Sequence, residues 1–288
     1  MLEATFSPLV PTDESESFYI KFYNQFCFIQ VNDAFIMRLK EYLTKDDTEE
    51  LLSTLNNFHE DQNIAAVFSL GAGIMNETLM RRRKENRGVS IELFNCLRSE
   101  NIDPLDWYEK AFEFLMIYAT CEQAVKEYLM SKENKSKDTK IKEANLLNDL
   151  FNELIKSDLR DNFIKELKNG SSSVITSQNE LISAWRYYTL FRHTLAHAGG
   201  RTTDNMKTNM KEVIDKNRKE LESINSAMFM ELSEEDDFFT SPLDGTVISI
   251  TDKHLNFFRN MAILIVESLE RAIHPNEYEI RDFDPYKL

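Results

Sequence analysis

The chain has 288 residues, 42% of them hydrophobic, which is enough to bury one or two cores of ordinary size. Its formal net charge of −15 is spread along the whole chain and argues against a nucleic-acid binder that is held by general attraction to phosphate. The 3 cysteines are widely spaced and contain no Cys-x-x-Cys pair, which argues against a disulfide framework and against a thiolate zinc site.

Two features of the sequence bear on its location. The first residues, Met1-Leu2-Glu3, lack the basic and apolar regions of a secretory signal. The longest apolar stretch, residues 64–75, is too short and too interrupted by glycine to span a bilayer. We therefore expect a cytoplasmic protein that has no membrane partner.

Glycine and proline are scarce, with 7 and 6 residues, and this predicts a chain that is mostly helical. Residues 18–31 are the exception, because they are dense in aromatic and β-branched side chains and are interrupted by two amide residues. That pattern favours a short β-hairpin over a helix. Helices are expected over 32–43 and 48–59. Residues 1–100 contain no cluster of catalytic groups, so we expect a smaller, mostly helical domain that regulates the rest of the chain or binds a partner.

The remainder of the chain, residues 101–288, predicts long amphipathic helices. Asp103 and Pro104 form a strong helix start, because the aspartate caps the helix and proline fits its first position. This helix is expected to run to about Met130. Further helices are expected over residues 141–168, 177–198, 204–230 and 252–274, with a strand-like stretch over 246–250.

Local signals predict where two of these helices begin or end. Ser177 and Glu180 have the spacing of a capping box at the start of helix 177–198, and Gly199-Gly200 is expected to end it. Thr251 or Asp252 is expected to cap the last helix.

Arg192, His193 and His197 lie near the end of the predicted helix 177–198, where the chain concentrates groups capable of chemistry. Only 5 histidines occur in the sequence, so two of them one helical turn apart beside an arginine stand out. The two histidines face away from the apolar stripe of this helix, whereas Arg192 falls within it. The stripe consists of Leu181, Ala184, Trp185, Tyr188, Phe191 and Leu195.

An arginine within an apolar face needs an anion or a carboxylate, because its unpaired burial costs several kcal/mol. Glu122 occupies a comparable position on the apolar stripe of the preceding long helix. We therefore expect Glu122 and Arg192 to pair where the two helices meet. The alternative is a buried salt bridge with no role beyond packing.

This arrangement resembles the HEPN superfamily, the small α-helical ribonucleases of toxin–antitoxin, anti-phage and CRISPR-linked systems. Their signature is an arginine, a polar residue, a few further residues and then a histidine, set late in a helix. Arg192, His193 and His197 match these three positions in order. Glu122 matches the acidic residue that many members carry in the preceding helix. The resemblance covers about residues 103–275.

The resemblance implies an all-α fold, with a HEPN-like antiparallel helical bundle over residues 101–288. It also implies a ribonuclease that acts as a homodimer with a composite active site, and that serves as a toxin or anti-phage effector. A trigger protein or an antitoxin is then an expected partner. One branch of the family carries a tyrosine shortly after the histidine, which a partner nucleotidyltransferase modifies, but this chain has Gly199 at that position.

These residue types suit RNA cleavage independently of the resemblance. Attack of the 2′-hydroxyl on the phosphate needs a base, an acid and a cation that stabilises the crowded phosphorane oxygens. His197 is expected to transfer protons and Arg192 to bind the scissile phosphate. His193 and Glu122 are expected to support them. No metal ion or other cofactor is needed, so we expect a metal-independent endoribonuclease.

A basic run in the N-terminal part is a further candidate for binding the RNA substrate. Arg186, which together with His193 fits a looser form of the motif, is added to it. The run could equally be a solvated helix end whose cations complement the helix dipole. The residues expected to contact RNA are Arg81, Arg82, Arg83, Lys84, Arg87 and Arg186.

Two other classes of function stay open. One is a non-catalytic helical module that binds nucleotides or partner proteins, in which the pair of Arg192 and Glu122 is purely structural. The other is a metal-dependent hydrolase built on His193 and His197, with Asp204 as the third ligand. The His-Glu-x-x-His pattern of such enzymes is missing from this chain.

Overall fold

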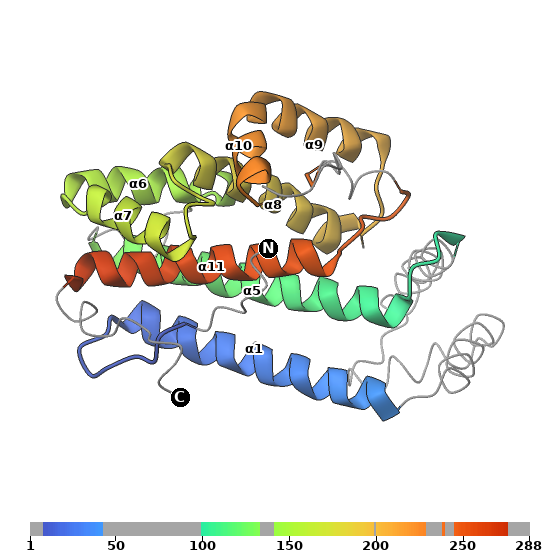
Figure 1. Ribbon diagram of the computed structural model, residues 1–288, viewed down its shortest axis with the longest axis horizontal. Helices are drawn as coiled ribbons and strands as arrows, with labels where there is room; N and C mark the ends of the chain where they lie inside the picture. Colours follow the sequence, from blue (N-terminus) through green and yellow to red (C-terminus); the bar gives the residue numbers. More distant parts are fainter. Residues whose placement is uncertain are drawn as a thin grey trace, which may run out of the picture.

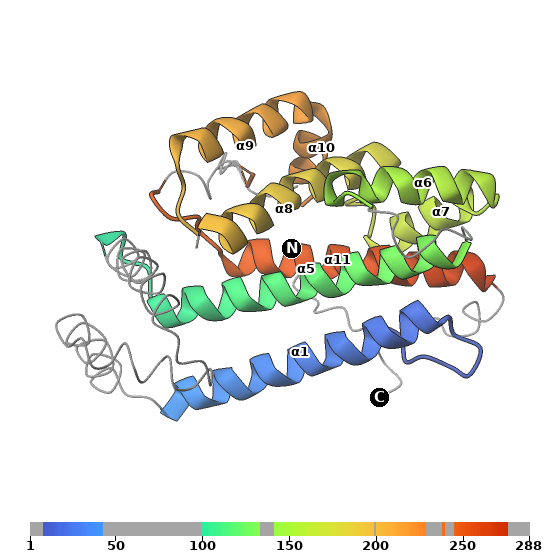
Figure 2. The same cartoon turned by 180° about the vertical axis from the view of Figure 1, so that it is seen from behind.

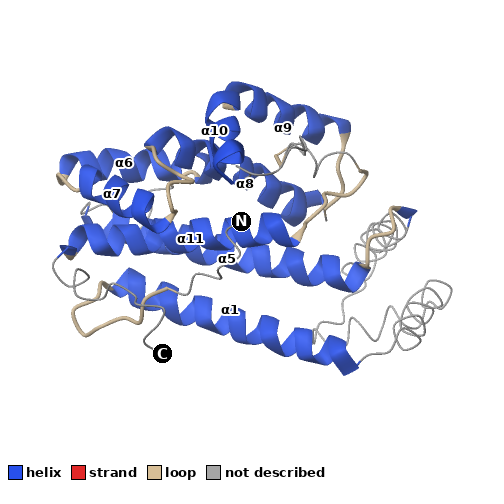
Figure 3. Cartoon of the chain, in the orientation of Figure 1, coloured by secondary structure: helices blue, strands red, loops and turns tan. Residues whose placement is uncertain are grey.

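The computed structural model describes residues 8–42, 99–132, 141–198, 200–228, 238–239 and 245–275. The side chains of residues 39–42, 104, 105, 197 and 198 lie outside this description as well. All regular structure within these ranges is helical, which confirms the predicted all-α fold (Figure 3). None of the described helices has the length and apolar character that crossing a membrane requires.

Three long helices, α1, α5 and α11, run side by side along the long axis of the molecule (Figures 1 and 2). The other helices pack over α5 and α11 on the side away from α1 (Figure 1). In chain order the helices are α1 (Ser17–Tyr42), α5 (Pro104–Lys132), the 3-10 helix η1 (Glu143–Asn145), α6 (Leu146–Lys156), α7 (Arg160–Gly170), α8 (Gln178–Ala198), α9 (Asp204–Lys216), α10 (Arg218–Met228) and α11 (Asp252–Ile273).

The bundle mixes parallel and antiparallel neighbours. α1 runs antiparallel to α5, because Lys21 Nζ lies 2.8 Å from Glu127 Oε2 and, further along α1, Gln30 Nε2 donates to Glu113 Oε1 at 2.9 Å. The colours in Figure 1 show that α8 also runs opposite to α5, whereas α11 runs in the same direction as α5. The antiparallel arrangement expected for residues 101–288 therefore holds for α5 and α8, but not for α5 and α11.

The β-hairpin predicted at 18–31 is wrong, because these residues form the first part of α1. Their buried side chains recur at the spacing of one helix face, whereas the amide residues Asn24 and Gln25, expected at the turn, are exposed. Packing of this face against the bundle overrides the strand preference of aromatic and β-branched residues. The separate helix expected over 32–43 continues α1. The buried residues are Phe18, Tyr19, Phe22, Phe26 and Ile29.

A buried ion pair joins α5 to α11, and a hydrogen bond to the same carboxylate adds α1. The side chain of Glu113 is 4% exposed, and its Oε1 accepts hydrogen bonds from Arg259 Nε and from Gln30 Nε2, both at 2.9 Å. Burial raises the pKa of Glu113, and the charge of Arg259 opposes that rise. Breaking this pair would leave a buried charge, so it ties α5 to α11, and Gln30 holds α1 to the same carboxylate. α1 packs along α5, and residues 43–98 lie outside the described part of the chain, so the domain boundary at residue 100 stays a prediction.

Two predicted helices are interrupted. The helix expected over 141–168 is divided into η1, α6 and α7, and Asp158 between α6 and α7 has a φ of 58°, a left-handed conformation that ends a helix. The helix expected over 204–230 is divided at the buried Asn217, whose side-chain oxygen accepts from Ser183 Oγ at 3.1 Å. Such side-chain bonding competes with the regular backbone pattern of a helix.

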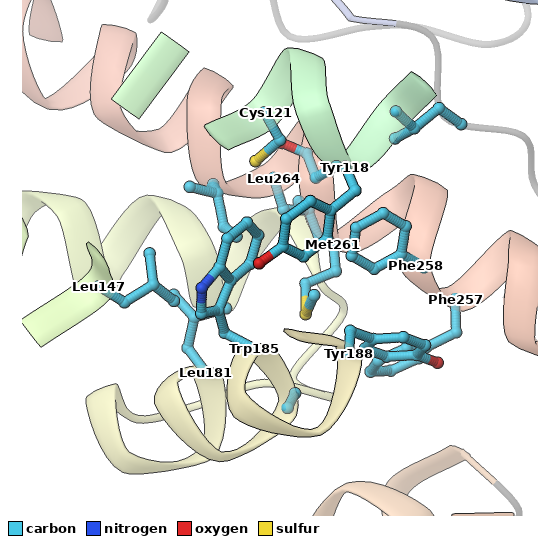
Figure 4. Close-up of a cluster of buried hydrophobic side chains, with 14 of the residues drawn as sticks. Tyr118, Cys121, Leu147, Leu181, Trp185, Tyr188, Phe257, Phe258, Met261 and Leu264 are labelled. Carbon is cyan, nitrogen blue, oxygen red and sulfur yellow. The ribbon is translucent and has the colours of Figure 1, made fainter. Parts of the chain in front are cut away.

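The apolar stripe predicted on helix 177–198 is buried, and it forms the centre of the core with α5 and α11 (Figure 4). The ring of Tyr118 from α5 stacks on Trp185 of α8 with 4.8 Å between ring centres. The same tyrosine ring stacks on Phe258 of α11 at 5.9 Å. This rigid aromatic stack lies directly beneath the predicted functional residues.

A buried histidine fixes the start of α11. Thr251 caps this helix, as predicted, and its Oγ1 accepts from the backbone nitrogen of His254 at 3.3 Å. The ring of His254 places Nδ1 at 2.7 Å from Thr251 Oγ1 and Nε2 at 2.8 Å from the carbonyl oxygen of Phe238, so Nε2 carries the proton. Burial lowers the pKa of His254 from 6.5 to about 4, although the Phe238 carbonyl opposes the change.

We expect this histidine to make folding stability depend on pH. The folded state holds the His254 proton less tightly than the unfolded chain, so its contribution is complete above pH 6.5 and is lost as the pH falls toward about 4. In wild type this loss amounts to about 3 kcal/mol of unfolding free energy. Urea unfolding from pH 7 to pH 4 should show a smaller loss in His254→Gln. An identical pH slope in both proteins would contradict the assignment.

Candidate functional site

The sequence fixes the start of α8 as predicted. Ser177 Oγ accepts from the backbone nitrogen of Glu180 at 3.3 Å, and Glu180 Oε2 accepts from the backbone nitrogen of Ser177 at 3.0 Å. This is the reciprocal capping box expected from the residue types. Burial would raise the pKa of Glu180, but hydrogen bonds from Thr176 and Ser223 outweigh it and lower the pKa. The register of α8, and with it the place of the motif, is set at this end.

Gly200 sets the other end of the motif helix. Its φ is +82°, and its backbone nitrogen donates to the carbonyl oxygen of Thr194 at 3.0 Å. A Cβ at this position would lie 2.3 Å from the ring of Trp107, so a side chain has no room. The stretch predicted as a strand over 246–250 contributes one isolated bridge, between Val247 and Arg201, rather than a strand. It packs beside Gly200 and closes this end of α8.

The predicted pairing of Glu122 with Arg192 is wrong. The carboxylate of Glu122 accepts instead from Lys126, one turn further along α5. Arg192 reaches a different carboxylate, that of Glu143 in η1, with 3.2 Å between Nη1 and Oε2. The physical reason is that the Arg192 side chain is 26% exposed and lies over the ring of Tyr118, where it meets Glu143. Glu122 is engaged by Lys126 instead.

The carboxylate of Glu143 links Arg192 and His193. Its Oε2 atom lies 3.2 Å from Arg192 Nη1 and 3.0 Å from His193 Nε2, so one oxygen accepts from both side chains. The two donors are partly exposed, with 43% of the His193 side chain open to solvent. We define Glu143, Arg192 and His193 as the carboxylate-bridged cluster. Sequence reasoning missed Glu143, because no helical spacing relates η1 to a residue near the end of α8.

The carboxylate-bridged cluster packs against the aromatic core. The guanidinium carbon of Arg192 lies 5.8 Å from the ring centre of Tyr118, within range of a cation–π interaction. Trp185 Nε1 donates to the backbone carbonyl of Glu143 at 3.2 Å and so anchors η1 against α8. Burial raises the pKa of Tyr118, and the nearby charges of Glu122 and Glu143 raise it further. Tyr118 is therefore a neutral platform rather than an acid or base.

The remaining predicted residues are only partly placed. His197 lies in α8 one helical turn after His193, but its side chain is outside the described part of the chain. Arg186 is exposed on α8, two turns before His193 and on the same helix face. The basic run of residues 81–87 lies outside the described residues. Arg186 and His193 therefore lie on one face of α8, and Arg192 is next to His193 in the chain.

The described side chains include no group of three or more His, Cys, Asp or Glu residues arranged to hold a metal ion. His193 is therefore not joined by Asp204, the third ligand considered above, in any such group of described residues. The side chain of His197 lies outside the described residues, so the metal-dependent alternative is tested by the effect of EDTA on activity.

The chemical capacity of the cluster follows from its donors. A guanidinium and an imidazole converge on one oxygen atom of a partly exposed carboxylate, and proteins bind carboxylates and phosphates in this way. Comparisons with protein-family models, with curated proteins and with solved structures found no match for this chain. The resemblance to the HEPN superfamily therefore depends on the motif residues alone.

We expect Gly200→Ala to destabilise the protein. The substitution forces a side chain into a left-handed conformation and against Trp107, which should cost about 3 kcal/mol of unfolding free energy. Ala196→Ser, an exposed change at the same end of α8, should cost less than about 0.5 kcal/mol. Thermal and urea unfolding measure both effects. Equal stability of Gly200→Ala and wild type would contradict the close contact that ends α8.

Proposed function

We propose that this protein is a metal-independent endoribonuclease whose active site is the end of α8 that carries Arg192. The observation that supports the proposal is that Arg192 and His193 lie side by side, are both partly exposed, and converge on one oxygen atom. A phosphate oxygen at that point would meet a bidentate cation and a group that can move protons near neutral pH. His197 follows one helical turn later.

The proposed reaction needs only these groups. The 2′-oxygen of the ribose attacks phosphorus while the bond from phosphorus to the 5′-oxygen breaks. A base takes the proton of the 2′-hydroxyl and an acid gives a proton to the leaving 5′-oxygen, so the products are a 2′,3′-cyclic phosphate and a 5′-hydroxyl end. Arg192 binds the non-bridging oxygens as charge develops on them. His197 is the proposed proton-transfer group, with His193 in support.

Arg186 extends the proposed RNA contact along α8. It is exposed and shares a helix face with His193, so it can meet a phosphate next to the one being cleaved. The chain as a whole has a net charge of −15, which means that RNA must be held by such local contacts rather than by general attraction. The basic run of residues 81–87 stays a prediction as a second contact.

We also propose a homodimer, and the surface that fits a second copy is an apolar face on α1 and α5. The two polar contacts between these helices fix their register, which places Phe28 level with Met116 and Phe35 level with Tyr108. Phe28 is 65% exposed and Phe112 is 59% exposed. The α1–α5 apolar face consists of Phe28, Val31, Phe35, Tyr108, Phe112 and Met116.

A second copy of this chain is the occupant that suits the size of this face. Its exposed side chains present on the order of 500 Å² of apolar surface, the size of the largest apolar patches on protein surfaces, which are often sites of association. Each side of a stable interface buries about 800 Å², which this face and its polar rim can supply. The proposed composite site needs a dimer, because separate copies then supply the acid and the base.

The proposed cellular role is that of a toxin or anti-phage effector acting in the cytoplasm. Its expected partners are a trigger protein or an antitoxin, and residues 1–100 are the expected regulatory part. A non-catalytic interaction module is the second candidate, and the α1–α5 apolar face is the observation that favours it, because such surfaces mark sites of protein association. RNA left intact by a folded wild-type dimer would favour this second candidate.

RNA cleavage by purified variants tests the nuclease directly. We expect His197→Ala to lower the cleavage rate about 10²–10⁴-fold, the usual contribution of a general acid or base. Arg192→Ala should lower it about 10²–10³-fold through loss of transition-state stabilisation. Arg218→Ala, a surface change on α10, is the control and should cleave like wild type. EDTA should not change the rate, and loss of activity in EDTA would support the metal-dependent alternative instead.

The oligomeric state tests the proposed interface. Light scattering should find wild type as a dimer at micromolar concentration, and Phe112→Asp should weaken that dimer at least tenfold, since it places a charge in the apolar face. Ile155→Asp changes a residue on α6 that is 57% exposed outside this face, so the dimer should persist. Cleavage should fall with the dimer in Phe112→Asp. A monomeric wild type that cleaves RNA fully would rule out the composite site.

A further inference from the structure

We infer that Glu143 occupies the position of a phosphate oxygen, so that the Arg192–His193 pair is a phosphate-binding site which the chain fills with its own carboxylate. A ligand of the phosphodiester or phosphate class must displace this carboxylate in order to bind. The inference rests on the proposed function for the identity of its substrate, but the anion site itself follows from the geometry of the cluster.

The contacts converge in the way that a bound phosphate oxygen requires. Arg192 Nη1 and His193 Nε2 approach a single atom, Glu143 Oε2, at 3.2 and 3.0 Å. A phosphate oxygen in the same place would accept the same two hydrogen bonds at the same distances. A phosphodiester carries one negative charge, as the carboxylate does, so the exchange leaves the charge in contact with Arg192 and His193 unchanged.

The carboxylate can leave without disturbing its surroundings. η1 is held to α8 through the backbone carbonyl of Glu143, which accepts from Trp185 Nε1, and this contact does not involve the carboxylate. The side chain of Glu143 is already 26% exposed, so it can rotate into water, where its charge is solvated. η1 has no side-chain cap that such a rotation would break. Only the Glu143 side chain needs to move.

The donors stay in place when the carboxylate leaves. Arg192 lies over the buried ring of Tyr118, which the stacked Trp185 and Phe258 hold from α8 and α11. Glu122, the neighbouring carboxylate of α5, is engaged by Lys126. The vacated site is therefore a preformed arrangement of donors, which reduces the entropic cost of binding an anion.

Competition with the Glu143 carboxylate favours ligands that carry a negative charge. A neutral ligand cannot replace the carboxylate, because it would leave Arg192 without an anion. A single phosphate should bind weakly, since it must first release an internal partner. An oligonucleotide gains additional contacts along α8 at Arg186 and so displaces Glu143 more readily than inorganic phosphate does.

Binding of probes that cannot be cleaved tests the inference. The probes are inorganic phosphate and a fully 2′-O-methylated oligonucleotide, titrated into the full chain and followed by the histidine ring signals in NMR spectra and by calorimetry. Glu143→Gln keeps the shape of the side chain but removes its charge, and it should bind both probes about tenfold more tightly than wild type. Arg192→Gln should lose binding. Glu212→Gln is the matched control, because it removes a carboxylate on α9 that pairs with Lys216 rather than with Arg192, and it should change affinity less than twofold.

Whether Glu143→Gln binds the probes more tightly or more weakly than wild type tests the inference. Equal or weaker binding by Glu143→Gln would overturn the inference, because the carboxylate would then support the two donors rather than compete with a ligand. Glu143→Ala, compared at a matched fraction of folded protein from its thermal unfolding, provides the same test with a second side chain. Tighter binding by the Glu143 variants without RNA cleavage in any protein would keep the inference and reject the nuclease. Cleavage by wild type with no gain in Glu143→Gln would reject the inference alone.

Discussion

One carboxylate oxygen, Glu143 Oε2, holds Arg192 and His193 together, and the character of this site depends on that contact. It keeps a cation and an imidazole close to each other at the surface without burying a charge. Beneath it, Tyr118 and Trp185 form a stacked pair that belongs to the core, so the donors are supported by close-packed side chains. The site therefore combines a rigid base with one exposed side chain that can be exchanged.

This arrangement bears on how an acidic protein would hold the anionic substrate that we propose. With a net charge of −15 the chain repels RNA at long range, and binding must depend on a few oriented donors. The cluster supplies such donors, and its internal carboxylate neutralises them while no substrate is bound. Arg192 is paired with the Glu143 carboxylate in the structure, and in our proposal the phosphate of a ligand takes its place, so the guanidinium has an anion in both states.

The sequence predicted the elements whose signals are local. The capping box of Ser177 and Glu180, the glycine at the end of α8 and the buried stripe between them all follow from short-range spacing, and they are confirmed. The first part of α1, residues 18–31, was predicted as a hairpin because its composition favours strands, but its buried positions recur with the period of a helix. Glu143 could not be predicted, since it meets Arg192 from 49 residues away, through a turn that only the packed structure defines.

The most direct measurement of the central claim is a crystal structure with a 2′-O-methylated dinucleotide, whose phosphodiester cannot be cleaved. The account predicts a phosphate oxygen within hydrogen-bonding distance of Arg192 Nη1 and His193 Nε2, with the Glu143 side chain rotated into solvent and Tyr118 and Trp185 unmoved. A dinucleotide bound elsewhere, or bound beside a Glu143 carboxylate that still accepts from Arg192, would contradict it.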